Sequence, residues 1–198
     1  MSSLWKLEES RFMLARSREH KDYLWRDPGD HRLAYEFYVD ATLHALFGIK
    51  DFLRKEFAHH ESVEGVKFED WYRECITDHL KREGSVLGFL FKKGKGVRQV
   101  STHQEPLTLS ATGSRSSSRS LDGFESNIET HMDFFFQDLQ MAAMDESCPD
   151  WKKALAERSV DAVLQDALDK LTQCVREAFQ LFEGSSYILE GSLRIIDG

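Results

Sequence analysis

Apolar residues recur every three to four positions along most of the chain, which is the spacing that places them on one side of an α-helix. This pattern predicts helices over residues 3–25, 30–58, 68–91, 124–144 and 151–182. Ser3 is expected to cap the first helix, and Asp27-Pro28-Gly29-Asp30 is expected to form the turn before the second, because proline and glycine disfavour a helix interior. About five helices without alternating strands predict a mainly α fold, an antiparallel helical bundle.

The helical spacing stops between residues 92 and 123. Residues 97–102 and 107–112 are rich in β-branched side chains, so they predict a small β-hairpin or a pair of extended strands. The serine-rich stretch 113–120 predicts a polar loop. We therefore expect a single helical-bundle domain over residues 1–198, with an irregular basic insertion at about 92–123.

One apolar run does not fit the helical pattern, namely Phe134-Phe135-Phe136. Successive helical residues point about 100° apart around the helix axis, so three neighbouring phenylalanines cannot all face one core. We expect one of them to reach the surface and contact a second copy of the chain, because exposed apolar side chains mark interfaces. The run therefore predicts a homodimer.

Composition and charge narrow the function classes. The 198 residues include 26 Lys or Arg and 34 Asp or Glu, which gives a formal net charge of −8, and 41% are hydrophobic. An acidic chain of ordinary globular composition is not expected to coat nucleic acid through its overall charge. It has no apolar run of the roughly 20 residues that a membrane span needs. Three distant cysteines without a CxxC pair favour a reducing, cytoplasmic location.

The charge is unevenly distributed along the chain. Residues 81–120 contain eight basic and two acidic side chains, a net charge of +6, which leaves −14 for the rest. A local basic segment on an acidic body can contact an anion without making the whole protein bind polyanions. A solvated loop that is basic for solubility would show the same pattern, so charge alone does not decide between the two interpretations.

Common catalytic motifs are absent from the sequence. It contains no P-loop, no glycine-rich dinucleotide fingerprint, no HExxH and no GxSxG, which removes the simplest NTPase, oxidoreductase, zincin and α/β-hydrolase interpretations. His44, His79 and His131 lie on predicted helices that also carry carboxylates, and they offer an alternative metal site within the bundle. The two Glu-x-x-His pairs of a di-iron bundle are missing, so we expect no metal and no cofactor.

The strongest local candidate for a catalytic site is the pair Arg98 and His103 within the basic segment. A guanidinium offers a rigid fork of donors for phosphate oxygens, and an imidazole can take or deliver a proton near neutral pH. Together they could cleave RNA without a metal: one group activates the ribose 2′-OH or protonates the leaving oxygen, and the other stabilises charge at phosphorus. The residues expected to bind the substrate are Lys92, Lys93, Lys95, Ser101 and Thr102.

This spacing resembles the motif of the HEPN superfamily, a group of helical bundles in which a histidine follows an arginine after four to six residues. Gln99 occupies the position after the arginine, where asparagine or aspartate is more usual. The predicted helices at 33–57 and 68–91 resemble those that precede the motif in HEPN proteins, so the resemblance covers residues 33–107. It implies a homodimer in which two copies of Arg98 and His103 share a cleft, with an RNA substrate and an antitoxin as protein partner.

Three functions are compatible with these observations. The first is RNA binding or metal-independent endoribonuclease activity in a toxin–antitoxin or defence context, carried out by a cytoplasmic homodimer without membrane contact. The second is a non-catalytic, partner-binding module of the same superfamily, in which Arg98 and His103 only brace a surface loop. The third is a metal-binding bundle built around the histidines named above. We expect the first.

Overall fold

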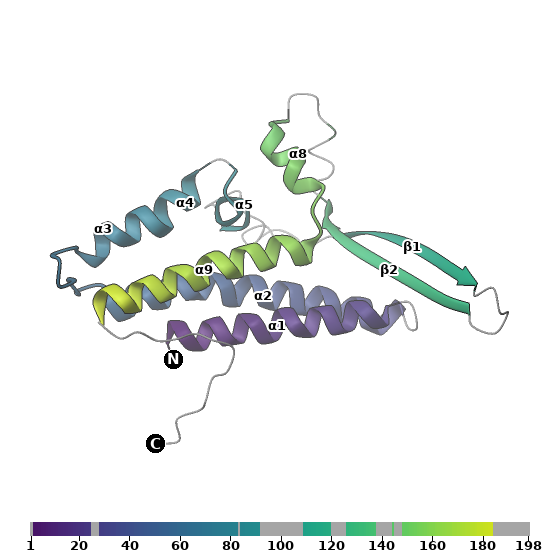
Figure 1. Cartoon of the computed structure of the whole chain (residues 1–198), viewed down its shortest axis with the longest axis horizontal. Helices are drawn as coiled ribbons and strands as arrows, with labels where there is room; N and C mark the ends of the chain where they lie inside the picture. The colour runs from purple at the N-terminus through teal and green to yellow at the C-terminus, as the bar shows by residue number, and fades with distance from the viewer. Residues whose placement is uncertain are drawn as a thin grey trace, which may run out of the picture.

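Three long helices form the body of the protein (Figure 1). The computed structural model describes residues 2–24, 28–82, 84–91, 109–119, 126–137, 144 and 148–183. Helices α1 (Ser3–Tyr23), α2 (Pro28–Phe57) and α9 (Val160–Phe182) pack against one another. A two-stranded antiparallel sheet is added to the helices. The mainly α bundle with a small β-hairpin that the sequence predicts is therefore confirmed.

The ends of the long helices follow from their local sequences. The Ser2 hydroxyl accepts a hydrogen bond from the Trp5 N–H, so Ser2, and not Ser3 as predicted, caps α1. The backbone N–H of Ser3 instead donates to Glu56 Oε1 over 3.0 Å, which ties the start of α1 to the end of α2. Pro28 is the first residue of α2, a position that suits proline because its N–H would have no partner there.

The core lies between α1, α2 and α9. Leu7 and Leu14 of α1, Leu46 of α2 and Val163 and Val175 of α9 are almost completely buried. At one end of the bundle an aromatic cluster closes the core, formed by Phe57, Phe68, Trp71, Phe179 and Phe182. Edge-to-face contacts such as that between Phe57 and Phe179, with ring centroids 5.1 Å apart, add to the energy of burial.

The single helix predicted over residues 68–91 is interrupted. The chain forms α3 (Phe68–Tyr72), a π-helical turn η1 (Arg73–Thr77) and α4 (Asp78–Lys81), and then turns into α5 (Val86–Phe91). Gly84 has φ +80°, a left-handed conformation that favours glycine. A Cβ on Gly88 would lie 3.0 Å from the Arg82 carbonyl oxygen, so α5 packs closely against the end of α4. The apolar spacing continues through this break and therefore does not reveal it.

The single helix predicted over residues 151–182 is also divided. It consists of α8 (Asp150–Ala156) and α9, and Ser159 lies between them. The Ser159 hydroxyl accepts a hydrogen bond from the Ala162 N–H and so caps α9.

The β-hairpin differs in position from the one predicted. Strand β1 (Leu109–Arg119) pairs antiparallel with β2 (Ser126–Phe136), from Leu109 opposite Phe136 to Arg119 opposite Ser126. The helix predicted over 124–144 is therefore wrong, and so is the loop predicted over 113–120. The predicted strand at 97–102 lies outside the described residues. The hairpin projects away from the helical bundle in Figure 1.

The strand geometry also explains the three phenylalanines. Alternate residues of a strand point to opposite faces, so Phe134 and Phe136 are buried on one face while Phe135 is half-buried on the other. The Phe134 ring lies 4.3 Å from that of Tyr35 in α2, measured between centroids. The helical argument for a phenylalanine in a dimer contact therefore no longer holds.

A buried polar network joins the hairpin to the bundle. Lys21 Nζ of α1 lies 2.9 Å from Asp133 Oδ1 of β2 and 2.7 Å from Asp161 Oδ2 of α9. The Tyr35 hydroxyl donates to Asp161 Oδ1 over 3.3 Å. Burial alone would lower the pKa of Lys21, but its hydrogen bonds to the two carboxylates raise it. These contacts position the base of the hairpin beside the three long helices.

None of the helices in the described ranges carries an apolar stretch that could cross a bilayer.

Candidate anion-binding pocket

The catalytic and substrate-binding residues predicted from the sequence lie outside the described residues. They are Arg98, His103, Lys92, Lys93, Lys95, Ser101 and Thr102. The segment that carries them follows directly on α5, whose last residue is Phe91. The structure therefore describes the helices that precede these residues in the sequence, and their surface carries groups that could contact an anion.

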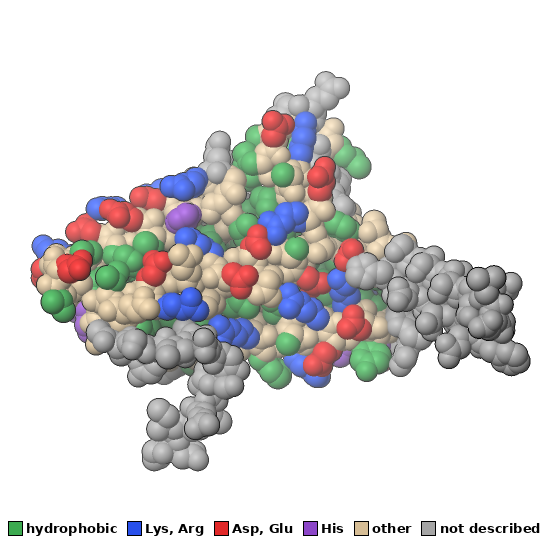
Figure 2. Space-filling model, viewed as in Figure 1, with side chains coloured by type: hydrophobic (Ala, Val, Ile, Leu, Met, Phe, Trp, Pro, Cys, Tyr) green, Lys and Arg blue, Asp and Glu red, His purple; other side chains and the backbone are tan. Residues whose placement is uncertain are grey.

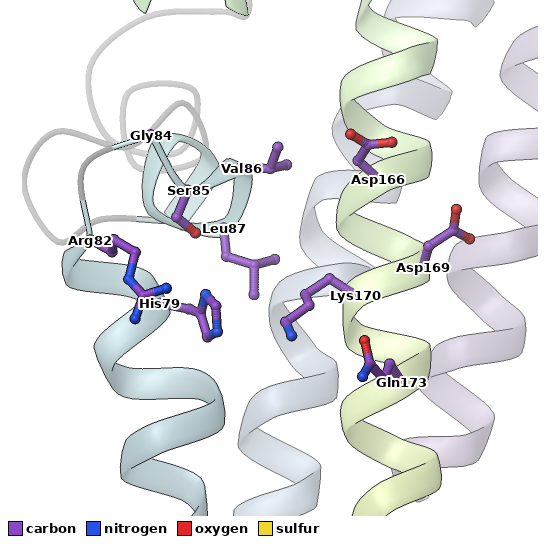
Figure 3. A pocket seen from close by; sticks show the side chains of 10 residues that line it. All are labelled: His79, Arg82, Gly84, Ser85, Val86, Leu87, Asp166, Asp169, Lys170 and Gln173. Carbon is purple, nitrogen blue, oxygen red and sulfur yellow. The ribbon is translucent and has the colours of Figure 1, made fainter. Parts of the chain in front are cut away.

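A pocket of about 590 Å³ lies between α4, the turn before α5 and helix α9 (Figure 3). Its wall combines charged, polar and apolar side chains. The lining residues are His79, Arg82, Gly84, Ser85, Val86, Leu87, Asp166, Asp169, Lys170 and Gln173.

The break between α4 and α5 forms one wall of this pocket. Helix α4 ends at Lys81, and the left-handed Gly84 then redirects the chain. The Ser85 carbonyl accepts a hydrogen bond from the Phe89 N–H over 2.9 Å, and its hydroxyl accepts a longer one, 3.4 Å, from the Gly88 N–H. An uninterrupted helix would have left no such concave surface, so the departure from the predicted 68–91 helix creates the site.

The acidic residues of the pocket already have partners. Asp166 Oδ2 lies 2.7 Å from the guanidinium of Arg158, and Asp169 Oδ1 accepts a hydrogen bond from Gln165 over 2.9 Å. The Asp169 side chain points away from α4 in Figure 3.

The basic residues of the pocket differ from the acidic ones in their ion pairing. Within the described ranges, neither Arg82 nor Lys170 forms an ion pair with a carboxylate. In Figure 3 the Lys170 side chain extends from α9 toward the imidazole of His79. Two permanent cations are thus available to a ligand, whereas the carboxylates beside them are engaged.

His79 lies beside both cations. Its pKa is lowered, first by burial and then by the positive charges of Lys170 and Arg82, while Asp78 acts in the opposite direction. The imidazole is therefore held in its neutral form and can accept a hydrogen bond or a proton. A negatively charged ligand would reverse the electrostatic part of this shift.

The face formed by α3, α4 and α9 carries acidic and basic side chains interspersed with one another, as Figure 2 shows. It has no broad basic area where the side chains are coloured. An anion contact here is therefore local, as the uneven charge along the sequence predicts.

The histidines give the metal-site alternative no support in the described part of the chain. No group of three or more His, Cys, Asp and Glu side chains there could hold a metal ion. His44 Nε2 lies 3.4 Å from Asp40 Oδ2 on the same helix. His79 belongs to the pocket, and the side chain of His131 is outside the description.

The cysteines are poor candidates for nucleophiles. Cys174 is buried in α9, and burial is the main cause that raises the pKa of its thiol to about 12. Burial likewise raises the pKa of Cys75. Because the thiolate is the nucleophilic form, both remain protonated at neutral pH, as expected for thiols on apolar helix faces.

Sequence reasoning identified only part of this pocket. Arg82 belongs to the basic segment 81–120, and His79 was a candidate metal ligand. Lys170 gave no signal, because it lies in a regular amphipathic helix far from the other two in sequence. Only the packing of α9 against α5 brings these residues together.

No protein-family model, no curated protein and no solved structure matches this chain. The function must therefore be argued from the residues themselves.

Proposed function

We propose that this protein binds RNA and cleaves it without a metal ion, as a HEPN-like endoribonuclease. One observation carries the proposal: Arg82, which belongs to the basic segment 81–120, and Lys170 of α9 line a pocket without ion-pair partners in the described residues. The adjoining helix α5 is followed in the sequence by the predicted substrate-binding lysines, beginning with Lys92. Uncommitted cations beside a basic segment are suited to contact phosphates. The resemblance of Arg98 and His103 to the HEPN motif supports the choice of RNA over other polyanions.

The proposed reaction uses two groups of this segment. Arg98 contacts the scissile phosphate and stabilises the negative charge that develops on its oxygens. His103 acts as the acid or base that moves a proton between the ribose 2′-OH and the leaving oxygen. Lys92, Lys93 and Lys95 contact the neighbouring phosphates, and Ser101 and Thr102 donate hydrogen bonds to the substrate. In a cytoplasmic homodimer, two such sites would share one cleft.

The charge of the remaining chain makes the contact selective. Outside residues 81–120 the net charge is −14, which repels long nucleic acid from most of the surface. We therefore expect binding of short or structured RNA at one site, in keeping with an RNA-specific toxin that an antitoxin protein controls.

The test is an RNA cleavage assay in excess chelator with the full chain, Arg98→Ala and His103→Ala. We expect cleavage by the parent and a loss of at least 100-fold in either variant, in line with the usual contribution of a general acid or base. Binding by Arg82→Ala and Lys170→Ala is measured alongside. Lys81→Ala and Arg176→Ala are matched controls, since each removes one charge from the same helices outside the pocket. Equal RNA binding by the full chain, the two pocket variants and the two control variants would refute the role of the pocket.

A second candidate, a non-catalytic module that binds a protein partner, is favoured by exposed apolar side chains. Trp5 and Phe12 of α1 and Leu33 and Phe37 of α2 are each more than half exposed. Residues seven or four apart lie on the same side of a helix, so each helix presents one apolar pair. Exposed pairs of this kind mark interaction surfaces.

Exposed carboxylates at the junction of α1 and α2, where the Leu33 and Phe37 pair begins, indicate the chemistry of a partner for that pair, while Trp5 lies at the other end of α1. Asp22 and Asp30 are exposed near the ends of α1 and α2 that adjoin each other, and neither forms an ion pair within the described ranges. They suit an amphipathic helix with basic side chains. A synthetic Leu/Lys helix should bind the protein better than a Leu/Glu helix, with the fluorescence of Trp5 as one readout. Retention of this preference by Phe12→Ser/Phe37→Ser would exclude the surface.

A further inference from the structure

The pocket between α4, α5 and α9 has the composition of a site for a single oxyanion. Arg82 approaches from α4 and Lys170 from α9, so two positive side chains on separate elements face one space (Figure 3). Ser85 adds a hydroxyl from the turn between them. A guanidinium and an ammonium on opposite walls are a common way to hold phosphate oxygens.

Protonation of His79 would add a third positive charge beside Arg82 and Lys170, and it is therefore disfavoured when no anion is bound. His79 faces Arg82 and Asp78 on its own helix. Across the pocket lie Lys170, Asp166, Asp169 and Gln173 of α9, and Ser85 and Leu87 from the α5 side. Arg158 forms an ion pair with Asp166, and Gln165 donates a hydrogen bond to Asp169. Among the charges that act on the imidazole, those of Lys170 and Arg82 outweigh that of Asp78.

An anion in the pocket changes this balance. A phosphate group between Arg82 and Lys170 would neutralise the charges that oppose protonation of His79, and the imidazolium would gain a direct electrostatic contact with it. Protonation and anion binding then favour each other, and thermodynamic linkage makes this coupling equal in both directions.

We propose that this pocket binds one phosphate group of an RNA backbone between Arg82 and Lys170, and that His79 takes up a proton as the phosphate binds. The inference rests on the RNA-binding function proposed above and adds to it a defined phosphate contact with its own pH dependence. Affinity for RNA rises as the pH falls through the range between the pKa of His79 in the free and in the bound protein. The maximum gain is about tenfold for each pH unit that separates the two values.

Proton uptake is tested by following the imidazole signals of the full chain by NMR. The probe is a decamer of 2′-O-methyluridine, which lacks the 2′-OH needed for the proposed cleavage, and whose bases are uncharged while its phosphodiesters keep one negative charge between about pH 5.5 and 7.5. The His79 signal is identified by its loss in His79→Gln. We expect the RNA to raise the pKa of His79 by at least about half a unit. An unchanged pKa under saturating RNA would overturn the proton-coupled site.

The affinity itself supplies the second readout. When the pH falls from about 7.5 to 5.5, binding of the decamer should strengthen more in the parent than in His79→Gln, by up to about threefold for a pKa difference of half a unit and up to about tenfold for one unit. His44→Gln is the matched control, because His44 lies on α2 outside the pocket, and it should keep the pH profile of the parent. If RNA binds but His79→Gln titrates like the parent, the coupling is wrong while RNA binding stands.

If the proposed RNA-binding function is wrong, the same experiments give a different result. If the decamer does not bind at any pH, RNA is the wrong ligand. Inorganic sulfate, a dianion throughout this range, then tests the pocket alone. A rise in the pKa of His79 with sulfate in the parent, absent in Arg82→Ala and Lys170→Ala, would keep the proton-coupled anion site and remove only the RNA. No rise with either probe would overturn the whole inference.

Discussion

The helical bundle and the β-hairpin are held in place in different ways. Helices α1, α2 and α9 surround a core in which many side chains are completely buried. Among the hairpin side chains that the structure describes, the deeply buried ones are Leu109, Phe134 and Phe136, all at its base. A two-stranded ribbon is at best marginally stable in water on its own. The bundle is therefore stabilised throughout its length, whereas the hairpin depends on the junction where it meets the bundle.

The largest effect is expected from a cavity in the bundle. Phe57→Ala removes a buried ring that contacts Phe68, Phe179 and Phe182, and it should lower the free energy of unfolding by about 3–5 kcal/mol. Phe37→Ala, on the same helix but 65% exposed, should change it by less than about 0.5 kcal/mol. Urea denaturation measures both. Similar losses in the two variants would mean that the bundle is not organised around this core.

The junction is tested by neighbouring phenylalanines of β2. Phe134→Ala should cost about 3 kcal/mol because the ring is buried against Tyr35, while Phe135→Ala, on the opposite face of the strand, should cost no more than about 1 kcal/mol. Thermal unfolding separates the two. Phe136→Ala distinguishes a strand from a helix: in the strand Phe136 is buried on the same face as Phe134 and its loss should cost a similar amount, whereas in a helix it would point about 200° away from Phe134. A small effect of Phe136→Ala would therefore contradict the strand assignment.

The polar part of the junction is expected to contribute less. Lys21→Met removes the ammonium that pairs with Asp133 and Asp161, and the buried Asp161 keeps only the Tyr35 hydroxyl among the partners described here. The loss should be about 2 kcal/mol, with faster amide exchange at the base of β2. The double variant Lys21→Met/Asp161→Leu should recover part of it, because it also removes Asp161, the more buried of the two carboxylates that pair with Lys21. A double variant as unstable as the single one would contradict this explanation.

The smallest effect concerns the pH dependence of the bundle. The folded protein keeps the Cys174 thiol protonated up to a pKa of about 12, while the unfolded chain releases this proton near pH 9. Stability from this group is therefore complete below pH 9 and is lost as the pH rises from 9 to 12, by about 1 kcal/mol at pH 10. Denaturation of Cys174→Ala at pH 8 and pH 10 should show a smaller pH-dependent loss than the parent. An identical loss would assign the effect to other groups.

The two regions also differ in how well the sequence predicts them. The bounds of α1 and α2 were predicted to within two residues, because both helices have a sustained helical spacing. Pro28, Gly29 and Asp30, which were predicted to lie in the turn between them, instead begin α2. The hairpin was misplaced for two reasons. The serine-rich β1 has no alternation of apolar residues, and Ile128, Met132 and the phenylalanines of β2 were interpreted as a helix. The Asp122-Gly123 dipeptide, which lies between the two strands in the sequence, is typical of a hairpin turn.

The pocket could not have been predicted in the same way. Its cations come from segments that only tertiary packing brings together, and its concave wall depends on the turn at Gly84. The sequence did locate an excess of positive charge next to this position, in residues 81–120. Local composition therefore indicated the part of the chain that contributes Arg82, but not Lys170 across the pocket.

The position of α9 in the chain has a consequence for synthesis. Helices α1 and α2 are neighbours in sequence and can form a helical hairpin as soon as both leave the ribosome. The faces of α1 and α2 that later pack on α9 remain uncovered until about a hundred further residues have been translated. At typical synthesis rates of about 5–20 residues per second, this apolar surface is exposed for roughly 5–20 seconds on every nascent chain, an interval in which a chaperone can bind it.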